Sequence, residues 1–239
     1  MTSQANDTII PALPVAALAV AGSNATFPVR RVYCVGRNYA EHAKEMGFTG
    51  REDPFFFNKP ADALLNVADG QTGLMPYPPK TSNLHYEIEL VVALDKGGRD
   101  LTPEQAASCV WGYAIGLDMT RRDLQGEAKK LGRPWEVGKA FDQSAPIGPL
   151  HAREKVGTLD AGAISLSVNG VAKQSSDLSQ MIWNIAESIA YLSGLFELKA
   201  GDIIFTGTPE GVGPVVPGDT MVGAVAGLGE LRVKVGDPA

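Results

Sequence analysis

Two glutamates one residue apart, Glu87 and Glu89, lie inside the most hydrophobic stretch of this chain, residues 84–94. The apolar residues of that stretch alternate with period two, which predicts a β-strand with both glutamates on one face. Two carboxylates placed in this way repel each other and resist burial, so a compensating positive charge is expected. A divalent metal would supply that charge. The alternative is a half-exposed strand with a solvated acidic face.

A third carboxylate, Asp118, ends a second predicted strand at residues 111–118, directly before a predicted helix. Together with Glu87 and Glu89 it would form an oxygen-only ligand set, which suits Mg²⁺ or Mn²⁺ better than Zn²⁺. Taken by itself, the position of Asp118 also fits a side chain that supports the N-terminus of the following helix.

His42 and Glu45 are three residues apart on a helix predicted for residues 39–46, so their side chains share a face. A glutamate in this position can orient the imidazole as a general base. The alternative is a polar pair on the surface, which the nearby Glu41 and Lys44 favour.

Several side chains could bind an anionic substrate. Arg122 and Gln125 fall in the first two turns of a predicted helix, residues 121–131, where a guanidinium could anchor a carboxylate. Arg121 and Arg122 diverge by about 100° on such a helix, so at least one of them must face solvent.

Two lysines, Lys59 and Lys139, stand in largely apolar surroundings. Each could bind an enolate or carboxylate, could form a Schiff base, or could extend its ammonium to solvent. Thr208 lies in a glycine-rich loop at residues 206–213, which could offer its hydroxyl and backbone N–H groups to an anion. The loop lacks the Gly-Lys-Ser/Thr ending of a phosphate-binding P-loop.

The elements that would position these residues are mostly strands. A helix is expected after the capping box at Thr102, another from Ser179 to Gly194, and one at 121–131 capped by Thr120. Residues 70–83 are expected to be a loop, and Asn169-Gly170 predicts a hairpin. Further strands are predicted at residues 32–36, 55–60, 202–205, 220–225 and 230–235. Strands and helices do not alternate regularly, so the predicted class is α+β with a dominant sheet.

Composition narrows the class of protein. The formal charge of −6 argues against a nucleic-acid binder with a broad basic face. The two cysteines give no disulfide framework, and no apolar run is long enough to cross a bilayer. We therefore expect a cytoplasmic protein with an N-terminal arm at residues 1–27 and one catalytic domain at residues 28–239.

In their order along the chain, these motifs resemble the fumarylacetoacetate hydrolase family. The resemblance is carried by GRNYAEHAKE at 36–45, NKP at 58–60, HYEIEL at 85–90, LDMTRRD at 117–123, KAF at 139–141 and TGTPEGVG at 206–213. Within this family, the segments 27–39 and 122–135 are most similar to bacterial acylpyruvate hydrolases, including the fumarylpyruvate hydrolases of aromatic (gentisate) degradation.

The resemblance implies a fold and a site. The fold would be a mixed, rolled β-sheet, usually assembled as a homodimer. The family's acidic ligands of Mg²⁺ or Mn²⁺ fall on Glu87, Glu89 and Asp118, and its catalytic pair falls on His42 and Glu45. Its other substrate-contacting positions fall on Arg122, Gln125, Lys139 and Thr208.

The implied reaction is hydrolysis of a carbon–carbon bond in a small 2,4-dioxo acid, with His42 activating water and Lys139 helping to stabilise the pyruvate enolate. Relatives that decarboxylate oxaloacetate, or that isomerise or dehydrate 2-oxo acids, share the same ligand set, so these reactions stay open. A Schiff-base aldolase using Lys139 or Lys59 and a metal-stabilised binding module without turnover are the alternatives from other classes.

Overall fold

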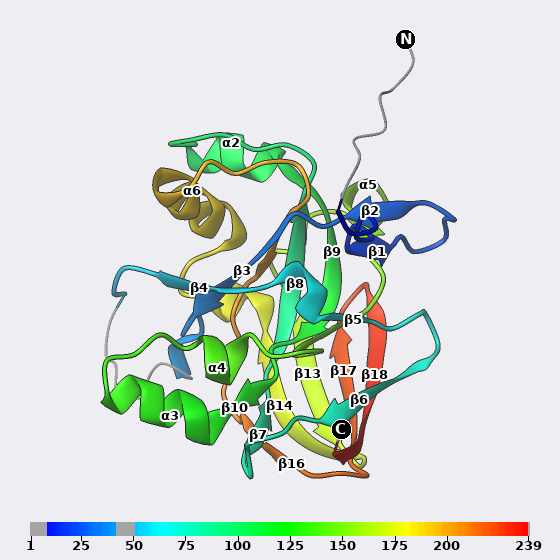
Figure 1. Ribbon diagram of the computed structural model, residues 1–239. Helices are drawn as coiled ribbons and strands as arrows, with labels where there is room; N and C mark the ends of the chain where they lie inside the picture. Colours follow the sequence, from blue (N-terminus) through cyan, green and yellow to red (C-terminus); the bar gives the residue numbers. More distant parts are fainter. Residues whose placement is uncertain (1–8, 42–50, 239) are drawn as a thin grey trace.

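The computed structural model describes residues 9–41 and 51–238 (Figure 1). Its largest sheet has eight strands, seven of them in the order β4-β3-β15-β8-β9-β11-β5, with β12 paired to β9. These strands are β3 (Arg31–Gly36), β4 (Phe55–Lys59), β5 (Leu64–Asn66), β8 (Ile88–Leu94), β9 (Val110–Leu117), β11 (Ala145–Ile147), β12 (His151–Ala152) and β15 (Asp202–Phe205). The sheet is mixed, since β15 runs parallel to β3 and antiparallel to β8.

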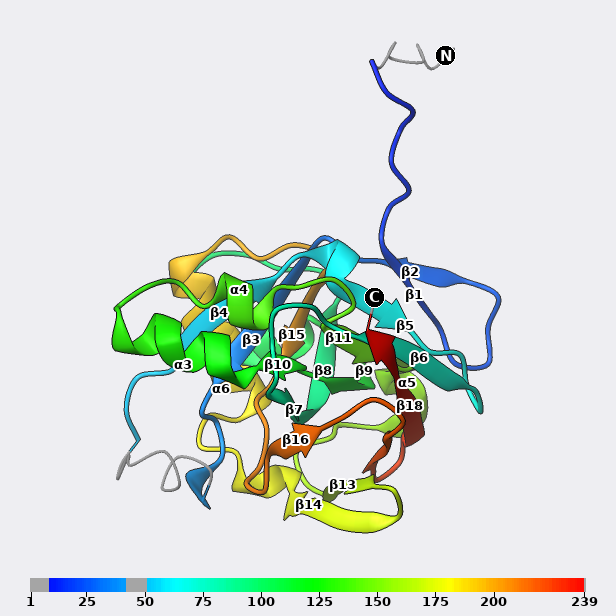
Figure 2. The same cartoon turned by 60° about the horizontal axis from the view of Figure 1, so that its bottom comes forward.

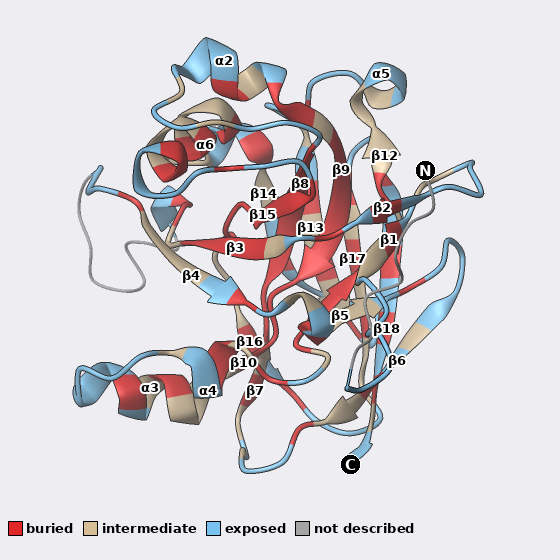
Figure 3. Ribbon diagram, turned by 45° about the horizontal axis from the view of Figure 1, so that its top comes forward, coloured by how far each residue is buried: buried red, intermediate tan, exposed pale blue. Residues whose placement is uncertain are grey.

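A second sheet of five strands has the order β14-β13-β17-β18-β6. Its strands are β6 (Thr72–Tyr77), β13 (Ala163–Val168), β14 (Val171–Asp177), β17 (Thr220–Val225) and β18 (Gly229–Pro238). Strands β13 and β17 pack against β8 and β9 of the first sheet. Buried side chains from both sheets, such as Leu90 and Leu166, therefore form one core. Figure 3 shows that β8 and β9 are buried along most of their length.

Smaller elements surround the two sheets. A hairpin joins β1 (Ala17–Ala19) to β2 (Thr26–Pro28), and a three-stranded sheet joins β10 (Thr120–Arg121), β7 (Leu84–Tyr86) and β16 (Gly213–Val215). Helices α2 and α6 contact each other at one end, whereas α3 and α4 lie together near β10 and β4 (Figures 1 and 2). The helices are α2 (Pro103–Ser108), α3 (Arg122–Lys130), α4 (Glu136–Lys139), α5 (Arg153–Val156) and α6 (Ile185–Leu195), with short 3-10 turns at Ala61–Ala63 and Leu178–Gln180.

The predicted α+β class and the mixed, curled sheet are confirmed. Local predictions also hold where a side chain or a turn dictates the backbone. Thr102 and Gln105 form the expected capping box at the start of α2. Asn169 and Gly170 take positive φ values of 51° and 78° and connect β13 to β14, as the type I′ hairpin turn requires.

The segment predicted as one strand, residues 84–94, is two strands in different sheets. Strand β7 ends at Tyr86 and β8 begins at Ile88, so Glu87 lies at the break between them. The predicted loop at residues 70–83 was also wrong in part, because it contains β6. That strand pairs in parallel with β18 at the edge of the second sheet, a long-range contact that turn residues in the sequence do not reveal.

Two predicted helix starts were wrong. Thr120 does not cap α3: it lies in β10, and its hydroxyl donates to the carbonyl of Asp118 at 3.1 Å. The helix expected from Ser179 begins instead after Asn184, which forms its own capping box with Glu187. Ser179 belongs to the short 3-10 turn that precedes it.

Within residues 9–41 and 51–238, no helix combines the length and the apolar character that crossing a membrane requires. The helix predicted for residues 39–46 lies largely outside these ranges. The domain boundary at residue 28 stays a prediction.

Candidate metal and substrate site

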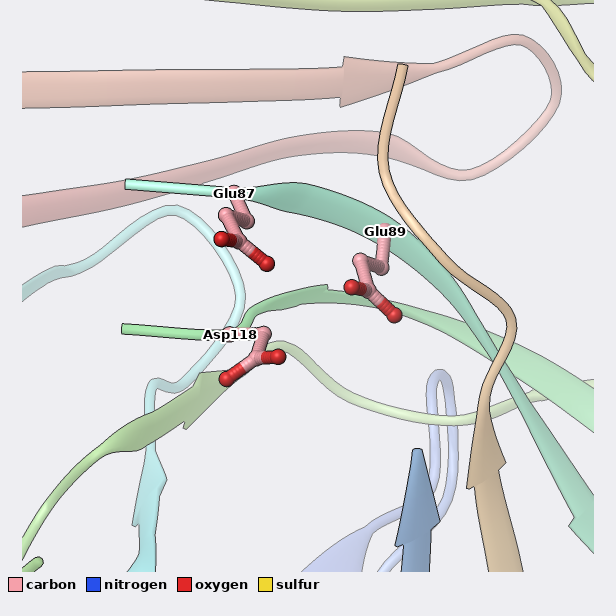
Figure 4. Close-up of side chains that lie close together, drawn as sticks. All are labelled: Glu87, Glu89 and Asp118. Carbon is pink, nitrogen blue, oxygen red and sulfur yellow. The ribbon is translucent and has the colours of Figure 1, made fainter. Parts of the chain in front are cut away.

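The antiparallel pairing of β8 with β9 brings three carboxylates together. Glu89 on β8 pairs with Gly116 on β9, and Asp118 follows the end of β9. The N–H of Asp118 donates to the carbonyl of Glu87 at 2.8 Å, which fixes the two segments at the strand break. The three side chains point toward a common space (Figure 4). One oxygen from each carboxylate lies within 4.8 Å of the others.

All three carboxylates are buried: Glu87 is 6% exposed, Glu89 2% and Asp118 0%. Burial raises the pKa of Glu89 well above its ordinary value, and the negative charges of Asp118 and Glu87 raise it further. The N–H of Gly207 donates to Glu89 Oε2 at 2.8 Å and partly offsets this effect. The solvated acidic face is therefore excluded, and the cluster requires positive charge.

The donor set fits a hard divalent cation. It consists of carboxylate oxygens alone, and each such oxygen has more than one lone pair, so an oxygen that accepts a hydrogen bond can still bind a metal. Glu87, Glu89 and Asp118 could thus hold a divalent metal.

Basic side chains compensate the same carboxylates. The ammonium of Lys139, at the end of α4, lies 2.9 Å from Glu87 Oε2 and 2.6 Å from Asp118 Oδ2. Burial by itself would lower the pKa of Lys139, but the charges of Asp118 and Glu87 outweigh it and raise that pKa. Lys139 is therefore protonated. A Schiff base needs a neutral amine, so this geometry does not favour the aldolase alternative.

Lys59 lies behind Asp118. Its ammonium is 2.8 Å from Asp118 Oδ1, donates to the carbonyls of Met119 and Lys139, and is fully buried. Neither Lys59 nor Lys139 extends to solvent. Because the ammonium of Lys59 faces protein groups and does not line the pocket, the predicted substrate contact of Lys59 gains no support here.

A pocket opens beside the triad of Glu87, Glu89 and Asp118. Arg122 forms an ion pair with Glu87, and its Nη1 donates to Gln125 Oε1 at 2.7 Å. The hydroxyl of Thr208 accepts from Gln174 Nε2 at 2.9 Å. Besides the triad, the pocket is lined by Val35, Gly36, Arg37, Phe55, Phe57, Arg122, Gln125, Lys129, Trp135, Lys139 and Thr208.

The structure thus brings eight of the ten predicted site residues to one region, with Lys59 behind it. The other two, His42 and Glu45, lie outside the described residues. Sequence reasoning missed Gln174, which is buried on β14 and also accepts from the N–H of Ile88 at 3.1 Å. It missed the aromatic pocket residues as well, although the Phe55–Phe57 run was visible as a strand.

Comparison with known proteins agrees with this geometry. The family described as fumarylacetoacetate (FAA) hydrolase C-terminal matches residues 31–236. A fumarylpyruvate hydrolase from Ralstonia sp. is 47% identical over 77% of this chain and 94% of its own. An oxaloacetate tautomerase from Escherichia coli is 43% identical over 84% of this chain and 90% of its own. An oxaloacetate decarboxylase from Dictyostelium discoideum is 41% identical over 83% of this chain and 90% of its own.

Among solved structures, the fumarylpyruvate hydrolase from Pseudomonas aeruginosa in complex with Mn²⁺ and pyruvate is 58% identical, with a TM-score of 0.95. The match covers 96% of this chain and 99% of that one. The prediction that the protein is a hydrolase acting on carbon–carbon bonds is confirmed. The chain belongs to the fumarylacetoacetate hydrolase family.

Proposed function

We propose that this protein hydrolyses fumarylpyruvate, a 2,4-dioxo acid, to fumarate and pyruvate with the help of Mg²⁺ or Mn²⁺. The buried triad of Glu87, Glu89 and Asp118 beside the protonated Lys139 carries the proposal. The similarity to a fumarylpyruvate hydrolase solved with Mn²⁺ and pyruvate supports the choice of metal and substrate.

The three carboxylates of the triad would hold the metal ion. When bound, the cation supplies a Lewis acid for the 2-oxo acid end of the substrate and lowers the cost of negative charge there. The ammonium of Lys139 lies against the same carboxylates, so it would stay charged and donate to a substrate oxygen beside the triad.

Water activation is assigned to His42 by the family resemblance, with Glu45 orienting the imidazole. His42 would remove a proton from water, and the resulting hydroxide would add to the C4 carbonyl. The C3–C4 bond then breaks, its electron pair remains on C3, and protonation of C3 gives pyruvate. The acyl fragment leaves as fumarate.

Two other side chains are held ready for hydrogen bonding. The Thr208 hydroxyl accepts from Gln174, so its own proton is left to donate into the pocket. The Gln125 carbonyl accepts from Arg122, so its amide NH₂ is left to donate. Both donors would orient the oxygens of a dioxo acid.

Oxaloacetate chemistry is the second candidate. The relatives from Escherichia coli and Dictyostelium discoideum, at 43% and 41% identity, are an oxaloacetate tautomerase and an oxaloacetate decarboxylase. Both reactions would use the same end of the substrate, so the triad alone does not separate them from acylpyruvate hydrolysis.

A substrate panel tests the proposal. Purified protein with Mg²⁺ or Mn²⁺ is given fumarylpyruvate, acetylpyruvate and oxaloacetate, and both enol absorbance and products are followed. We expect fumarate and pyruvate in equal amounts, with kcat/KM at least about tenfold higher for fumarylpyruvate than for acetylpyruvate. Faster tautomerisation or decarboxylation of oxaloacetate would replace this function with the second candidate.

The family resemblance also supports a homodimer and a role in aromatic catabolism, and the composition of the chain supports the proposal of a cytoplasmic location. Light scattering during size-exclusion chromatography would measure the mass of the assembly, for which we expect twice the mass of the 25.2 kDa chain.

A further inference from the structure

Helix α3 presents a row of polar side chains to the pocket. Arg122, Gln125 and Lys129 are spaced three and then four residues apart, so they share one helix face, and all three line the pocket. Arg122 reaches Glu87 at the inner end, and Gln125 is buried beside it. Lys129 lies seven residues beyond Arg122, about 10 Å along the helix axis, and is exposed at the outer end.

No acidic partner of Lys129 is found in the part of the chain that the structure describes. Among residues 9–41 and 51–238 it takes part in no ion pair and no hydrogen bond of its side chain, whereas Arg122 and Lys139 are both paired with the triad. The neighbours three and four residues away, which could pair with it on the helix, are Gln125, Gly126, Gly132 and Arg133. Lys129 therefore brings an uncompensated positive charge to the pocket.

The pocket is also lined by three aromatic side chains, Phe55, Phe57 and Trp135. Trp135 packs edge-on against Phe55, with ring centroids 5.4 Å apart, and against Phe57 at 5.9 Å. The guanidinium of Arg37 lies over the Phe55 ring at 4.6 Å. A flat, conjugated chain would pack against such rings. An anionic group at the outer end of that chain would then meet the positive charge of Lys129.

We propose that Lys129 binds the carboxylate at the far end of the acyl chain and so determines specificity for acylpyruvates that end in a carboxylate. The inference rests on the proposed function, because it places the pyruvyl end of the substrate beside the triad. Six bonds separate C1 from C7 of fumarylpyruvate, a span of about 7 Å, as in two extended residues. Helical side chains lean toward the N-terminus, so the side chain of Lys129 extends from its Cα toward Gln125.

Substrate length then separates the candidate functions. Oxaloacetate has only four carbons, so its second carboxylate would end well short of Lys129. The inference therefore favours a long dicarboxylate over both oxaloacetate and acetylpyruvate.

The test compares fumarylpyruvate with crotonylpyruvate, in which a methyl group replaces the distal carboxylate in a chain of the same shape. We expect the ratio of kcat/KM for fumarylpyruvate to kcat/KM for crotonylpyruvate to be about 5- to 20-fold lower in Lys129→Met than in the wild type. This range lies between the effect of losing an exposed ion pair and that of losing an enclosed, charge-assisted hydrogen bond. Lys129→Arg keeps the charge and should keep most of the ratio. Raising the salt concentration should lower the ratio in the wild type but not in Lys129→Met.

Lys130→Met is the matched control, because Lys130 is the next residue on the same helix, does not line the pocket, and has Glu127 three residues before it. Its ratio should stay within about twofold of the wild type. Equal ratios in Lys129→Met, Lys130→Met and the wild type would overturn the inference and leave the proposed function intact. A wild type that cleaves neither acylpyruvate would overturn both.

Discussion

The ammonium of Lys139 lies 2.6 Å from Asp118 Oδ2, with both side chains buried. Lys139, Lys59 and Arg122 together place three basic groups around the three carboxylates of the triad. When all are charged, the cluster is neutral, so a bound divalent metal would leave two positive charges in the pocket. That excess would favour an anionic substrate. The neutrality of the metal-free cluster explains why so many acids and bases can be buried together.

Lys59→Met tests the buried part of this cluster. The substitution leaves Asp118 with one partner fewer in a position that is 0% exposed. We expect the free energy of unfolding of the metal-free protein to fall by about 3–5 kcal/mol, the cost of breaking a buried ion pair. Denaturant titration with a chelator present measures this value. Lys130→Met, on an exposed helix face, is the control, and a loss below about 1 kcal/mol in Lys59→Met would contradict the account.

The Schiff-base alternative is tested by trapping. Because Asp118 and Glu87 raise the pKa of Lys139, its amine stays protonated and should not condense with a ketone. Borohydride added with pyruvate should leave the protein mass unchanged. A mass increase that disappears in Lys139→Arg would establish the aldolase mechanism instead.

General-base catalysis is tested at His42. His42→Ala should lower kcat about 10²- to 10⁴-fold, with a smaller change in KM, because a positioned base acts on the chemical step. Glu45→Gln should show a milder loss, since it disturbs only the orientation of the imidazole. Near-normal kcat in His42→Ala would move water activation to another group.

Acid sensitivity should depend on Asp123 in the first turn of α3. Its carboxylate accepts from the Thr81 hydroxyl at 2.6 Å and from the N–H groups of Ser82 and Leu124. Burial is the largest single effect and raises the pKa of Asp123, but the hydrogen bonds together outweigh it and lower that pKa below its usual 3.8. The stability it contributes is therefore complete above the unfolded pKa and is lost as pH falls through the folded one.

Asp123→Ala should accordingly be less stable than the wild type at pH 7 by about 1 kcal/mol, the usual net value of an intramolecular hydrogen bond. The difference should shrink as the pH falls below about 4. Thermal unfolding at several pH values measures it. A difference that grows on acidification would show that the ionised form is not the stabilising one.

The residues that cluster in the candidate site could be named from the sequence more readily than the bounds of the elements around them. Glu87 and Glu89 could be named as candidates because apolar residues alternate with period two throughout residues 84–94, although β7 ends and β8 begins within that stretch. Asp118 could be named because it directly follows a buried strand. Their convergence depends on the β8–β9 register, which places Glu89 opposite Gly116. That antiparallel pairing is a long-range contact that a single sequence leaves open.

Other features could not be predicted for physical reasons. Thr120 has the residue type of a helix cap, but pairing of β10 with β7 takes it into a sheet, and tertiary contacts outweigh local preference. The roles of Lys59 and Gln174 depend on burial across the sheets, where each satisfies a polar group from a distant segment. Local sequence carries no signal for such contacts.

We expect Glu87, Glu89 and Asp118 to hold the metal on which fumarylpyruvate hydrolysis depends. The most direct measurement is turnover of fumarylpyruvate by metal-stripped protein as Mn²⁺ is added, with Mn²⁺ binding followed in parallel in the wild type and in Glu89→Gln. We predict no turnover of fumarylpyruvate without metal and full recovery of turnover as one Mn²⁺ ion binds per chain. In Glu89→Gln, both Mn²⁺ binding and turnover should be lost. Full turnover in the presence of a chelator, or unchanged Mn²⁺ affinity in Glu89→Gln, would contradict this expectation.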